Sequence, residues 1–356
     1  MVLLNAETWP TAGTLDERAV AGVLDAGSGV VIETSGSTGM PKRVAVSAAA
    51  LRASAEATAA RIGSGRWVLA LPTHYVAGLQ VLVRSVLAGT SPVTVDGHFT
   101  AEAFAAATRA AGDGAPLFTS LVPAQLATVV EAAEQDAGIR AAAASYEAYL
   151  VGGQATPVAL RERAAALGIR LVRTYGSSET AGGCVYDGVP LDGVTVRAFE
   201  GELRIAGPTL AEGYLGNPGL TATTFVADAG TRWYRTGDLG TVHDGIVAVT
   251  GRADNVIISG GVNVSLDRVE RAVREVPGLE SAVVVGAGDE RWGQVPVIVA
   301  VLPRGSEHDT LLTAARAAAE TAVGAPARPR ELRVVGAIPM LPSGKPDRRA
   351  LAALFD

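Results

Sequence analysis

Short apolar runs alternate with longer, alanine-rich segments through the first two-thirds of the chain, and this alternation constrains the fold most. The apolar runs have the length of buried strands, and the segments between them have the length and composition of helices. Such an alternation predicts a mostly parallel sheet flanked by helices. The predicted strands are 67–71, 92–95, 117–121, 149–151 and 169–173, and the predicted helices are 47–62, 76–87, 101–111, 123–133 and 157–167.

The pattern of apolar and turn-forming residues changes twice towards the C-terminus. Between 185 and 250, short β-branched runs separated by Gly, Pro and Asp predict a β-rich section. After Gly251, two helix-like and three strand-like segments predict a small α+β unit; they are 266–276 and 309–323, then 282–286, 295–302 and 332–335. We therefore expect an α/β protein whose large N-terminal domain, residues 1–251, holds mostly parallel sheets flanked by helices plus the β-rich section. A small, mobile α+β C-terminal domain would span residues 252–356.

Composition narrows the class of protein. The chain has 356 residues, 48% of them hydrophobic, which excludes general disorder. A formal net charge of −6 offers no broad basic surface for nucleic acid. No apolar run is long enough to span a membrane, and the longest candidate, 76–87, is interrupted by Gln80 and Arg84. With a single cysteine, Cys184, and no leader-like N-terminus, we expect a cytoplasmic protein; the sequence leaves a homo-oligomer open.

Lysine is almost absent, and the two lysines stand in suggestive places. Of 30 basic residues only Lys42 and Lys345 are lysines, and each lies in a short segment rich in Gly and Pro. A codon bias explains the general scarcity but not these positions. An ammonium is a compact point charge, whereas guanidinium is a planar fork, so some chemistry near a phosphate or a reacting carboxylate tolerates only lysine. Both lysines are therefore candidate functional residues.

The strongest local motif is a loop of Gly and hydroxyl residues that follows the apolar run 30–32. Its residues are Thr34, Ser35, Gly36, Ser37, Thr38, Gly39, Met40, Pro41 and Lys42. Such a loop exposes backbone N–H groups that can wrap a polyphosphate, with one lysine to neutralise it. The spacing is not that of a Walker A loop. A flexible turn is the plain alternative, and the terminal lysine weakens it.

Two further clusters are weak when taken alone. The segment from Tyr175 to Thr180 follows a predicted strand, where open α/β sheets place ligands. Its tyrosine could stack on a base and Glu179 could hold a divalent cation, although a capped turn explains the pattern nearly as well. Asp238 follows Gly237 and suits a ribose diol, with a hairpin turn as the alternative.

Two loop segments complete the set. Arg252 and Asp254 lie at the predicted domain boundary, where residues act either as linker or as a hinge that absorbs backbone rotation. The segment 342–348 carries Lys345 and, taken alone, is typical of a solvated tail. The four histidines, His74, His98, His243 and His308, show no metal-ligand spacing, so a metal-dependent hydrolase is unsupported.

In this order, the segments resemble the adenylate-forming superfamily of acyl-CoA ligases, luciferases and peptide-synthetase adenylation domains, over about residues 30–351. Segments 211–215 and 221–225 also look like that family. The resemblance implies ATP, Mg²⁺ and coenzyme A as the small molecules bound. It implies a two-step reaction, in which an acid forms an acyl-adenylate with release of pyrophosphate and the CoA thiol then displaces AMP.

The resemblance also implies roles for individual residues. Those expected at ATP are residues 34–42, then Gly152, Gly153, Gln154, Tyr175, Gly176 and Ser178, with Asp238 at the ribose hydroxyls and Arg252 near ribose and phosphate. Those expected in catalysis are Glu179 at Mg²⁺, Lys345 between carboxylate and α-phosphate, and Arg252 as well. Asp254 is expected as the hinge, and Gly260 and Gly261 are expected to face CoA. The chain departs from the family at Ser178, where Thr is usual, and at Val262 and Leu266, where Glu and Pro are common. Little chain precedes the phosphate loop, so we expect a trimmed N-terminal region.

The substrate acid is indicated by an arginine inside an apolar helix. Arg84 lies in the predicted helix 76–87, and its plain expectation is to extend to solvent. The segments around it and around Ser120 resemble the o-succinylbenzoate–CoA ligases of menaquinone biosynthesis, in which an arginine here serves the second carboxylate. His74 and Tyr75 would line the same pocket, although structural roles are about as expected. The alternatives are another acyl- or aryl-CoA ligase, a peptide-synthetase adenylation module, and a non-enzymatic nucleotide-binding protein.

Overall fold

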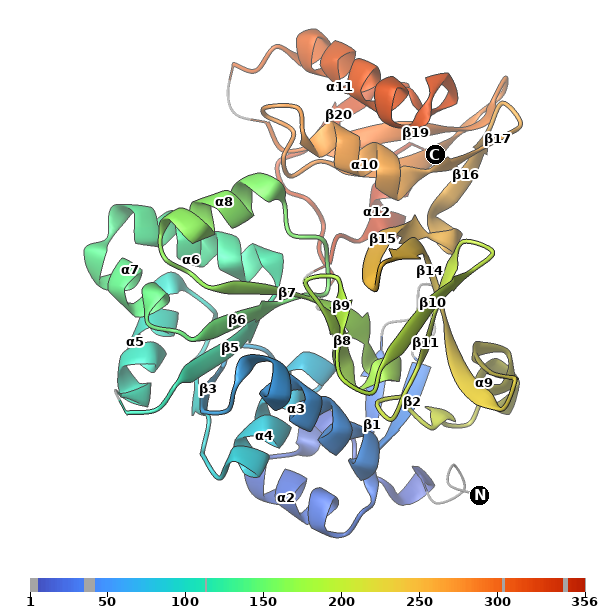
Figure 1. The fold of residues 1–356 in the computed structure, drawn as a ribbon. Coiled ribbons are helices and arrows are strands. Elements are labelled where there is room, and N and C mark those ends of the chain that lie inside the picture. Colours follow the sequence, from blue (N-terminus) through green and yellow to red (C-terminus); the bar gives the residue numbers. More distant parts are fainter. Residues whose placement is uncertain (1–5, 35–41, 113, 303–304, 342–344, 356) are drawn as a thin grey trace. The chain divides into compact units, whose positions relative to one another are not determined.

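The computed structural model describes residues 6–34, 42–112, 114–302, 305–341 and 345–355, and Figure 1 shows its elements. The described chain divides into two compact units. The first unit comprises the chain up to residue 197 together with 204–236 and 242–247, and the second comprises 198–203, 237–241 and 248 onward. The boundary expected at residue 251 and the mobility of the C-terminal part stay predictions.

A seven-stranded sheet forms the centre of the first unit, and its first five strands run parallel. In sheet order these are β4 (Val93–Thr94), β3 (Arg66–Leu69), β5 (Leu117–Leu121), β6 (Ala148–Val151), β7 (Leu171–Ser177), and the antiparallel β8 (Gly182–Tyr186) and β9 (Val189–Pro190). The predicted mostly parallel sheet is confirmed.

Helices cover both faces of this sheet (Figure 1). On one face lie α5 (Ala101–Ala111), α6 (Pro123–Gln135), α7 (Ala137–Ala144) and α8 (Val158–Ala166). Their buried side chains pack against β3, β5 and β6 around Phe104, Tyr146 and Tyr149. On the other face α3 (Ala48–Ile62) and α4 (Val76–Ala88) contact each other and the sheet, with α2 (Glu17–Asp25) packed against α4. The predicted helices are confirmed; α2 and α7 were not predicted.

A three-stranded antiparallel sheet stands beside these layers. It consists of β1 (Gly29–Thr34), β2 (Lys42–Ser47) and β12 (Gly213–Tyr214). Thr34 pairs with Lys42, so the two strands that carry the ends of the phosphate-loop motif are held side by side. The sequence had placed Lys42 in a loop, whereas it begins a strand.

The predicted β-rich section is a five-stranded sheet whose residues belong to both units. Its strands are β10 (Thr195–Phe199), β11 (Glu202–Ala206), β13 (Phe225–Asp228), β14 (Thr231–His243) and β15 (Ile246–Arg252), with α9 (Pro218–Thr224) before β13. The long strand β14 pairs with β11, β13 and β15.

The second unit contains a further sheet in the order β17-β16-β19-β18, with β20 parallel to β19. Its elements are β16 (Val256–Ser259), β17 (Val262–Ser265), α10 (Leu266–Arg274), β18 (Val283–Asp289), β19 (Gly293–Ala300), α11 (His308–Val323), β20 (Leu332–Val334) and α12 (Arg348–Ala352). The apolar faces of α10 and α11 pack on the sheet around Val269, Val273 and Ile298. The predicted α+β set is confirmed; the β16–β17 hairpin and α12 were missed.

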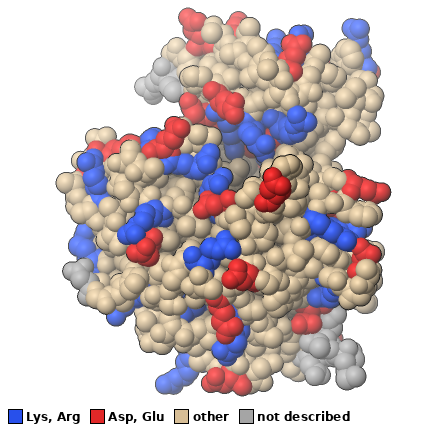
Figure 2. Space-filling model, viewed as in Figure 1, with Lys and Arg blue, Asp and Glu red and all other residues tan. Residues whose placement is uncertain are grey.

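Among the described residues, no helix is both long and apolar enough to cross a membrane. Lys/Arg and Asp/Glu side chains are interspersed over the face shown in Figure 2. Any anionic ligand on this face therefore depends on a few local groups rather than on a broad field.

Candidate active site

The phosphate-loop motif is framed by the β1–β2 pair. The Thr34 hydroxyl donates a hydrogen bond to the Lys42 carbonyl oxygen over 3.4 Å, which ties the two ends of the motif together. The five residues Ser35, Gly36, Ser37, Thr38 and Gly39 lie outside the described residues. The Lys42 ammonium stands 5.6 Å from the centroid of the Tyr214 ring, a cation–π distance.

The segment around Glu179 differs from the prediction. Strand β7 continues through Tyr175 and Gly176, and only Ser178–Thr180 forms a 3-10 turn. The strand continues because Gly176 packs closely against β8: a Cβ at Gly176 would lie 2.1 Å from the Gly182 carbonyl oxygen. The sequence had ended the strand at residue 173, since these small and polar residues carry no apolar strand signal.

Glu179 is 9% exposed and is held by a partner that the sequence analysis did not assign to the site. The Tyr214 hydroxyl donates to Glu179 Oε1 over 2.8 Å. Burial raises the pKa of Tyr214, and the Glu179 charge raises it further, so the phenol stays a donor. Because Lys42 stands at the ring of the same tyrosine, Tyr214 brings the lysine of the phosphate-loop motif and Glu179 to one place. The available signal was the family-like segment 211–215.

Of the expected adenine-site residues, Gly152 and Gly153 follow the end of β6, and Tyr175 and Gly176 lie in the second half of β7. Gly152 lies so close to Thr174 that a Cβ there would stand 2.3 Å from the Thr174 hydroxyl oxygen. Gly153 adopts a left-handed backbone with φ +82°, which favours glycine. Thr174 directly precedes Tyr175 in β7, so the structure brings the Gly152–Gly153 turn and Tyr175 together at a sheet end where α/β proteins bind ligands.

Arg84 is only 7% exposed, so the expectation that it extends to solvent is wrong. Its guanidinium lies over the Trp67 ring, 4.9 Å from the centroid, and Nη2 donates to the Thr58 hydroxyl over a long 3.4 Å. Its Nε has no hydrogen-bond partner among the described residues. Thr58 in turn bonds the Tyr186 hydroxyl at 2.9 Å. Burial lowers the pKa of Arg84, although a guanidinium remains charged at neutral pH.

A hollow of about 280 Å³ opens beside this guanidinium. It is lined by α3, α4 and the start of β3, with Thr58, Trp67 and Arg84 at its wall. A buried cation with an unused N–H beside such a space is suited to receive an anion. The other expected substrate residues are spread along the chain. Exposed His74 and half-buried Tyr75 stand together before α4, their rings 4.1 Å apart, and Ser120 is buried in β5.

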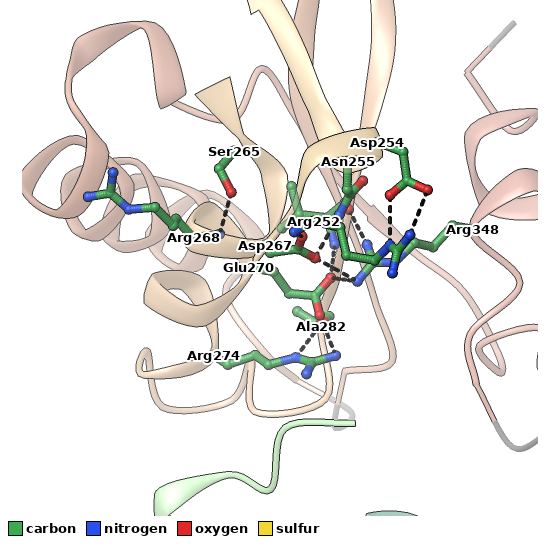
Figure 3. A network of polar contacts seen from close by, with 11 residues as sticks. Arg252, Asp254, Asn255, Ser265, Asp267, Arg268, Glu270, Arg274, Ala282 and Arg348 are labelled. Atoms are coloured by element: carbon green, nitrogen blue, oxygen red, sulfur yellow. Dashed lines mark hydrogen bonds and ion pairs between the residues drawn. The ribbon is translucent and has the colours of Figure 1, made fainter. Parts of the chain in front are cut away.

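In the second unit the structure brings Asp238, Arg252 and Asp254 together. Arg252 Nη1 donates to Asp238 over 2.9 Å, and Nε and Nη2 donate to the two Asp254 oxygens over 2.8 and 3.1 Å (Figure 3 shows the Arg252–Asp254 pair). Asp238 lies within strand β14 rather than after a turn. The strand signal was obscured by Gly237, which takes a left-handed φ of +69° inside the strand.

The remaining expected residues also lie in the second unit. Gly260 and Gly261 form the turn between β16 and β17, both with positive φ. A Cβ at Gly260 would stand 2.5 Å from the Trp292 ring, so this turn needs glycine. Lys345 is exposed, and its carbonyl oxygen accepts a hydrogen bond from the Leu341 N–H over 2.8 Å.

Family comparisons complete the description. The model of the AMP-binding enzyme family matches residues 29–199, and that of the AMP-binding enzyme C-terminal domain matches residues 268–345. A probable 2-succinylbenzoate–CoA ligase from Mycobacterium tuberculosis is 44% identical over 333 residues, covering 92% of this chain and 84% of the relative. The chain belongs to the AMP-binding enzyme family. The predicted resemblance is thereby confirmed.

Solved structures agree with this membership. An o-succinylbenzoate CoA synthetase from Bacillus subtilis, in complex with the acyl-adenylate intermediate OSB-AMP, matches with a TM-score of 0.77 at 26% identity. The match covers 90% of this AMP-binding enzyme and 68% of that chain. The same Bacillus subtilis protein with ATP and magnesium ion matches with a TM-score of 0.77, also at 26% identity, covering 90% of this chain and 69% of that one.

The residues present fit a magnesium ion that enters with ATP. No group of three or more His, Cys, Asp or Glu that could hold a metal occurs in the part of the chain that the structure describes. Mg²⁺ is commonly bound through one or two carboxylates plus substrate phosphates, and Glu179 offers such a carboxylate near Lys42.

Proposed function

We propose that this AMP-binding enzyme is an ATP-dependent acid–CoA ligase that joins 2-succinylbenzoate to coenzyme A in menaquinone biosynthesis. The ligase class follows from its family and from the 44% identical relative. The observation that carries the choice of acid is the buried guanidinium of Arg84, whose Nε has no partner among the described residues and which borders a hollow.

The first step forms an acyl-adenylate. A carboxylate oxygen of the acid attacks the α-phosphorus of ATP, and the bond to the leaving pyrophosphate breaks. We assign residues 34–42 to the phosphates, and Glu179, oriented by Tyr214, to the magnesium ion. Magnesium bound with ATP would neutralise phosphate charge. Lys345 would stabilise the charge that develops between the reacting carboxylate and the α-phosphate.

The adenosine part of ATP is assigned to two groups of residues. Gly152, Gly153, Gln154, Tyr175, Gly176 and Ser178 would hold the adenine end. Asp238 would accept hydrogen bonds from the ribose hydroxyls. Arg252, which already bonds Asp238 over 2.9 Å, would keep that carboxylate oriented beside ribose and phosphate.

The second step transfers the acyl group to CoA. The CoA thiol gives up its proton to solvent and its sulfur attacks the acyl carbon. The bond to AMP then breaks, and AMP leaves with the electron pair. We assign Gly260 and Gly261 to the CoA side and Asp254 to a hinge that alternates the two steps. The single cysteine takes no part as a nucleophile, because Cys184 is fully buried and burial raises the pKa of its thiol to about 12.

Selection of the acid is assigned to Arg84. A dicarboxylic acid presents a second carboxylate after the first has reacted, and a guanidinium can bind it through two parallel hydrogen bonds. His74, Tyr75 and Ser120 are assigned to the remainder of the acid. A monocarboxylic acid would leave the buried cation without an anionic partner, which costs free energy.

The test is a product assay. Purified protein, ATP, Mg²⁺ and CoA are mixed with 2-succinylbenzoate or with each of a panel of fatty and aromatic acids, and thioesters are identified by mass spectrometry. We expect 2-succinylbenzoyl-CoA, with AMP and pyrophosphate in equal amounts. Thioesters from other acids only would contradict the choice of acid and leave the ligase class. Absence of adenylation with every acid would contradict the ligase itself.

A further inference from the structure

The segment that carries Lys345 is anchored to the second unit by its backbone. The Leu341 N–H bonds the Lys345 carbonyl oxygen and the Asp347 N–H bonds the Pro339 carbonyl oxygen, each over 2.8 Å. Helix α12 then begins at Arg348, three residues after Lys345, with the Asp347 side chain as its N-cap. The position of Lys345 therefore depends on how firmly the start of α12 is held.

Arg348 supplies that hold through two short hydrogen bonds. Its Nη1 donates to the Val284 carbonyl oxygen of β18, and its Nη2 donates to Glu270 Oε2 of α10, both over 2.7 Å. Figure 3 shows Arg348 and Glu270. A planar guanidinium that bonds two elements at once fixes its own backbone in direction as well as in distance.

The receiving carboxylate is itself fixed. Glu270 is 7% exposed and accepts three groups: Arg348, the Val284 N–H over 3.0 Å, and Arg274 Nη2 over 2.9 Å. Two guanidinium groups thus share one buried carboxylate. If either arginine is removed, Glu270 keeps the other guanidinium as a partner, so neither substitution leaves a buried carboxylate unpaired.

The same arginine also approaches the segment that holds Arg252. Arg348 Nη2 lies 3.8 Å from Asp267 Oδ1, and Asp267 accepts hydrogen bonds from the Arg252 N–H over 2.8 Å and from Asn255 over 2.7 Å (Figure 3). The segment 252–255, in which Arg252 bonds Asp254, is therefore linked to the start of α12 within the second unit.

We propose that Arg348 is a positioning residue for Lys345: through Glu270 and Val284 it fixes the start of α12 and hence the lysine during adenylate formation. The proposal rests on the role assigned to Lys345 under the proposed function. That role belongs to the first step alone, and Asp267 keeps its hydrogen bonds from Arg252 and Asn255 without Arg348. Loss of Arg348 therefore acts on adenylate formation and spares thioester formation.

Two matched variants test the proposal. Arg348→Met and Arg274→Met each remove one of the two guanidinium partners of Glu270 and leave the same unbranched, shorter apolar side chain, but only Arg348 lies in the segment that carries Lys345. Adenylate formation is measured by acid-dependent exchange of pyrophosphate into ATP, and thioester formation by adding CoA to preformed acyl-adenylate. We expect Arg348→Met to lower the first rate at least tenfold and to leave the second within twofold. Arg274→Met should leave the ratio of the two rates unchanged, and Arg348→Lys should recover part of the loss.

Three results would overturn the assignment. Arg348→Met could leave both rates intact. It could lower both rates equally, which would make the effect one of general stability. Arg274→Met could produce the same selective loss, which would assign the effect to Glu270 rather than to Arg348. Lys345→Ala, measured in parallel, separates this proposal from the proposed function. A wild-type protein without exchange activity refutes both, whereas an active protein with a selective loss in Lys345→Ala and none in Arg348→Met refutes the positioning role alone.

Discussion

Replacing Arg84 by methionine should lower the selectivity for a dicarboxylic acid and should keep or raise the free energy of unfolding. Arg84 is only 7% exposed, and its contacts among the described residues include the Trp67 ring at 4.9 Å and a long 3.4 Å hydrogen bond to Thr58. Methionine is unbranched and apolar, fills part of the space of the arginine and needs no polar partner. Thr58 and Tyr186 keep their 2.9 Å bond to each other in the variant.

The expected magnitudes follow from these contacts. Two hydrogen bonds from the guanidinium to a substrate carboxylate, at about 1.5 kcal/mol each, total about 3 kcal/mol. Since about 1.4 kcal/mol corresponds to a factor of ten in rate, kcat/KM for the dicarboxylic acid should fall about 100-fold. In the absence of substrate, replacing a poorly paired buried charge by an apolar side chain is neutral or stabilises by about 1–4 kcal/mol. We therefore expect the free energy of unfolding to hold or rise.

The assay compares two acids, and a separate measurement compares the Tm of the wild type and the variant. Thioester formation is measured with 2-succinylbenzoate and with the analogue that lacks its non-reacting carboxylate, and Tm is measured without ligands. In Arg84→Met the preference for the dicarboxylic acid should collapse while the rate with the analogue is kept. Arg52→Met removes a less buried arginine that lines the same hollow and controls for loss of positive charge. A variant with unchanged selectivity and a lower Tm would show that Arg84 is a structural residue and would refute this reasoning.

Three further outcomes are expected. Lys345→Ala should lower pyrophosphate exchange at least 100-fold and leave thioester formation from preformed acyl-adenylate near wild type; equal losses in both would contradict its assignment. Tyr214→Phe removes the donor to Glu179 and should raise the Mg²⁺ concentration for half-maximal adenylation several-fold, whereas Tyr149→Phe, which also removes a buried phenol, should not. The pKa of Cys184 is raised to about 12 in the fold, so its stabilising contribution is present below the ordinary thiol pKa and is lost as pH rises. Between pH 8 and 10 the wild type should lose about 1.4 kcal/mol more unfolding free energy than Cys184→Ala; equal losses in urea titrations would contradict this.

Local signals in the sequence were sufficient for most of the secondary structure. Helix α5 matches its predicted bounds, and β5 does so as well, because apolar periodicity and capping residues act over a few positions. The missed elements lack such signals. Helix α7 follows α6 without a break in composition, since Asp136 ends one helix and caps the next. The β16–β17 hairpin turns on Gly260 and Gly261, which the sequence analysis had assigned to CoA.

The candidate site was also predicted only in part, because the sequence indicated its residues but not their partners. The two lysines and the Gly-rich segments, taken in their order, indicated a nucleotide-handling enzyme through their resemblance to the adenylate-forming superfamily. Their partners were not visible in the sequence. Tyr214 reaches Glu179 across 35 residues, and Arg348 reaches Glu270 across 78.

The burial of Arg84 is the sharpest case of what the sequence left open. Its position in an apolar helix fits both an arginine that extends to solvent and one that faces an anion. Trp67 of strand β3 and Thr58 of helix α3 enclose the guanidinium, and these contacts decide between the two possibilities. The sequence by itself determined which chemical groups are present and the elements that carry them, because those depend on short-range preferences. Only the tertiary structure decided which groups are buried together, because burial depends on contacts between segments far apart in the chain.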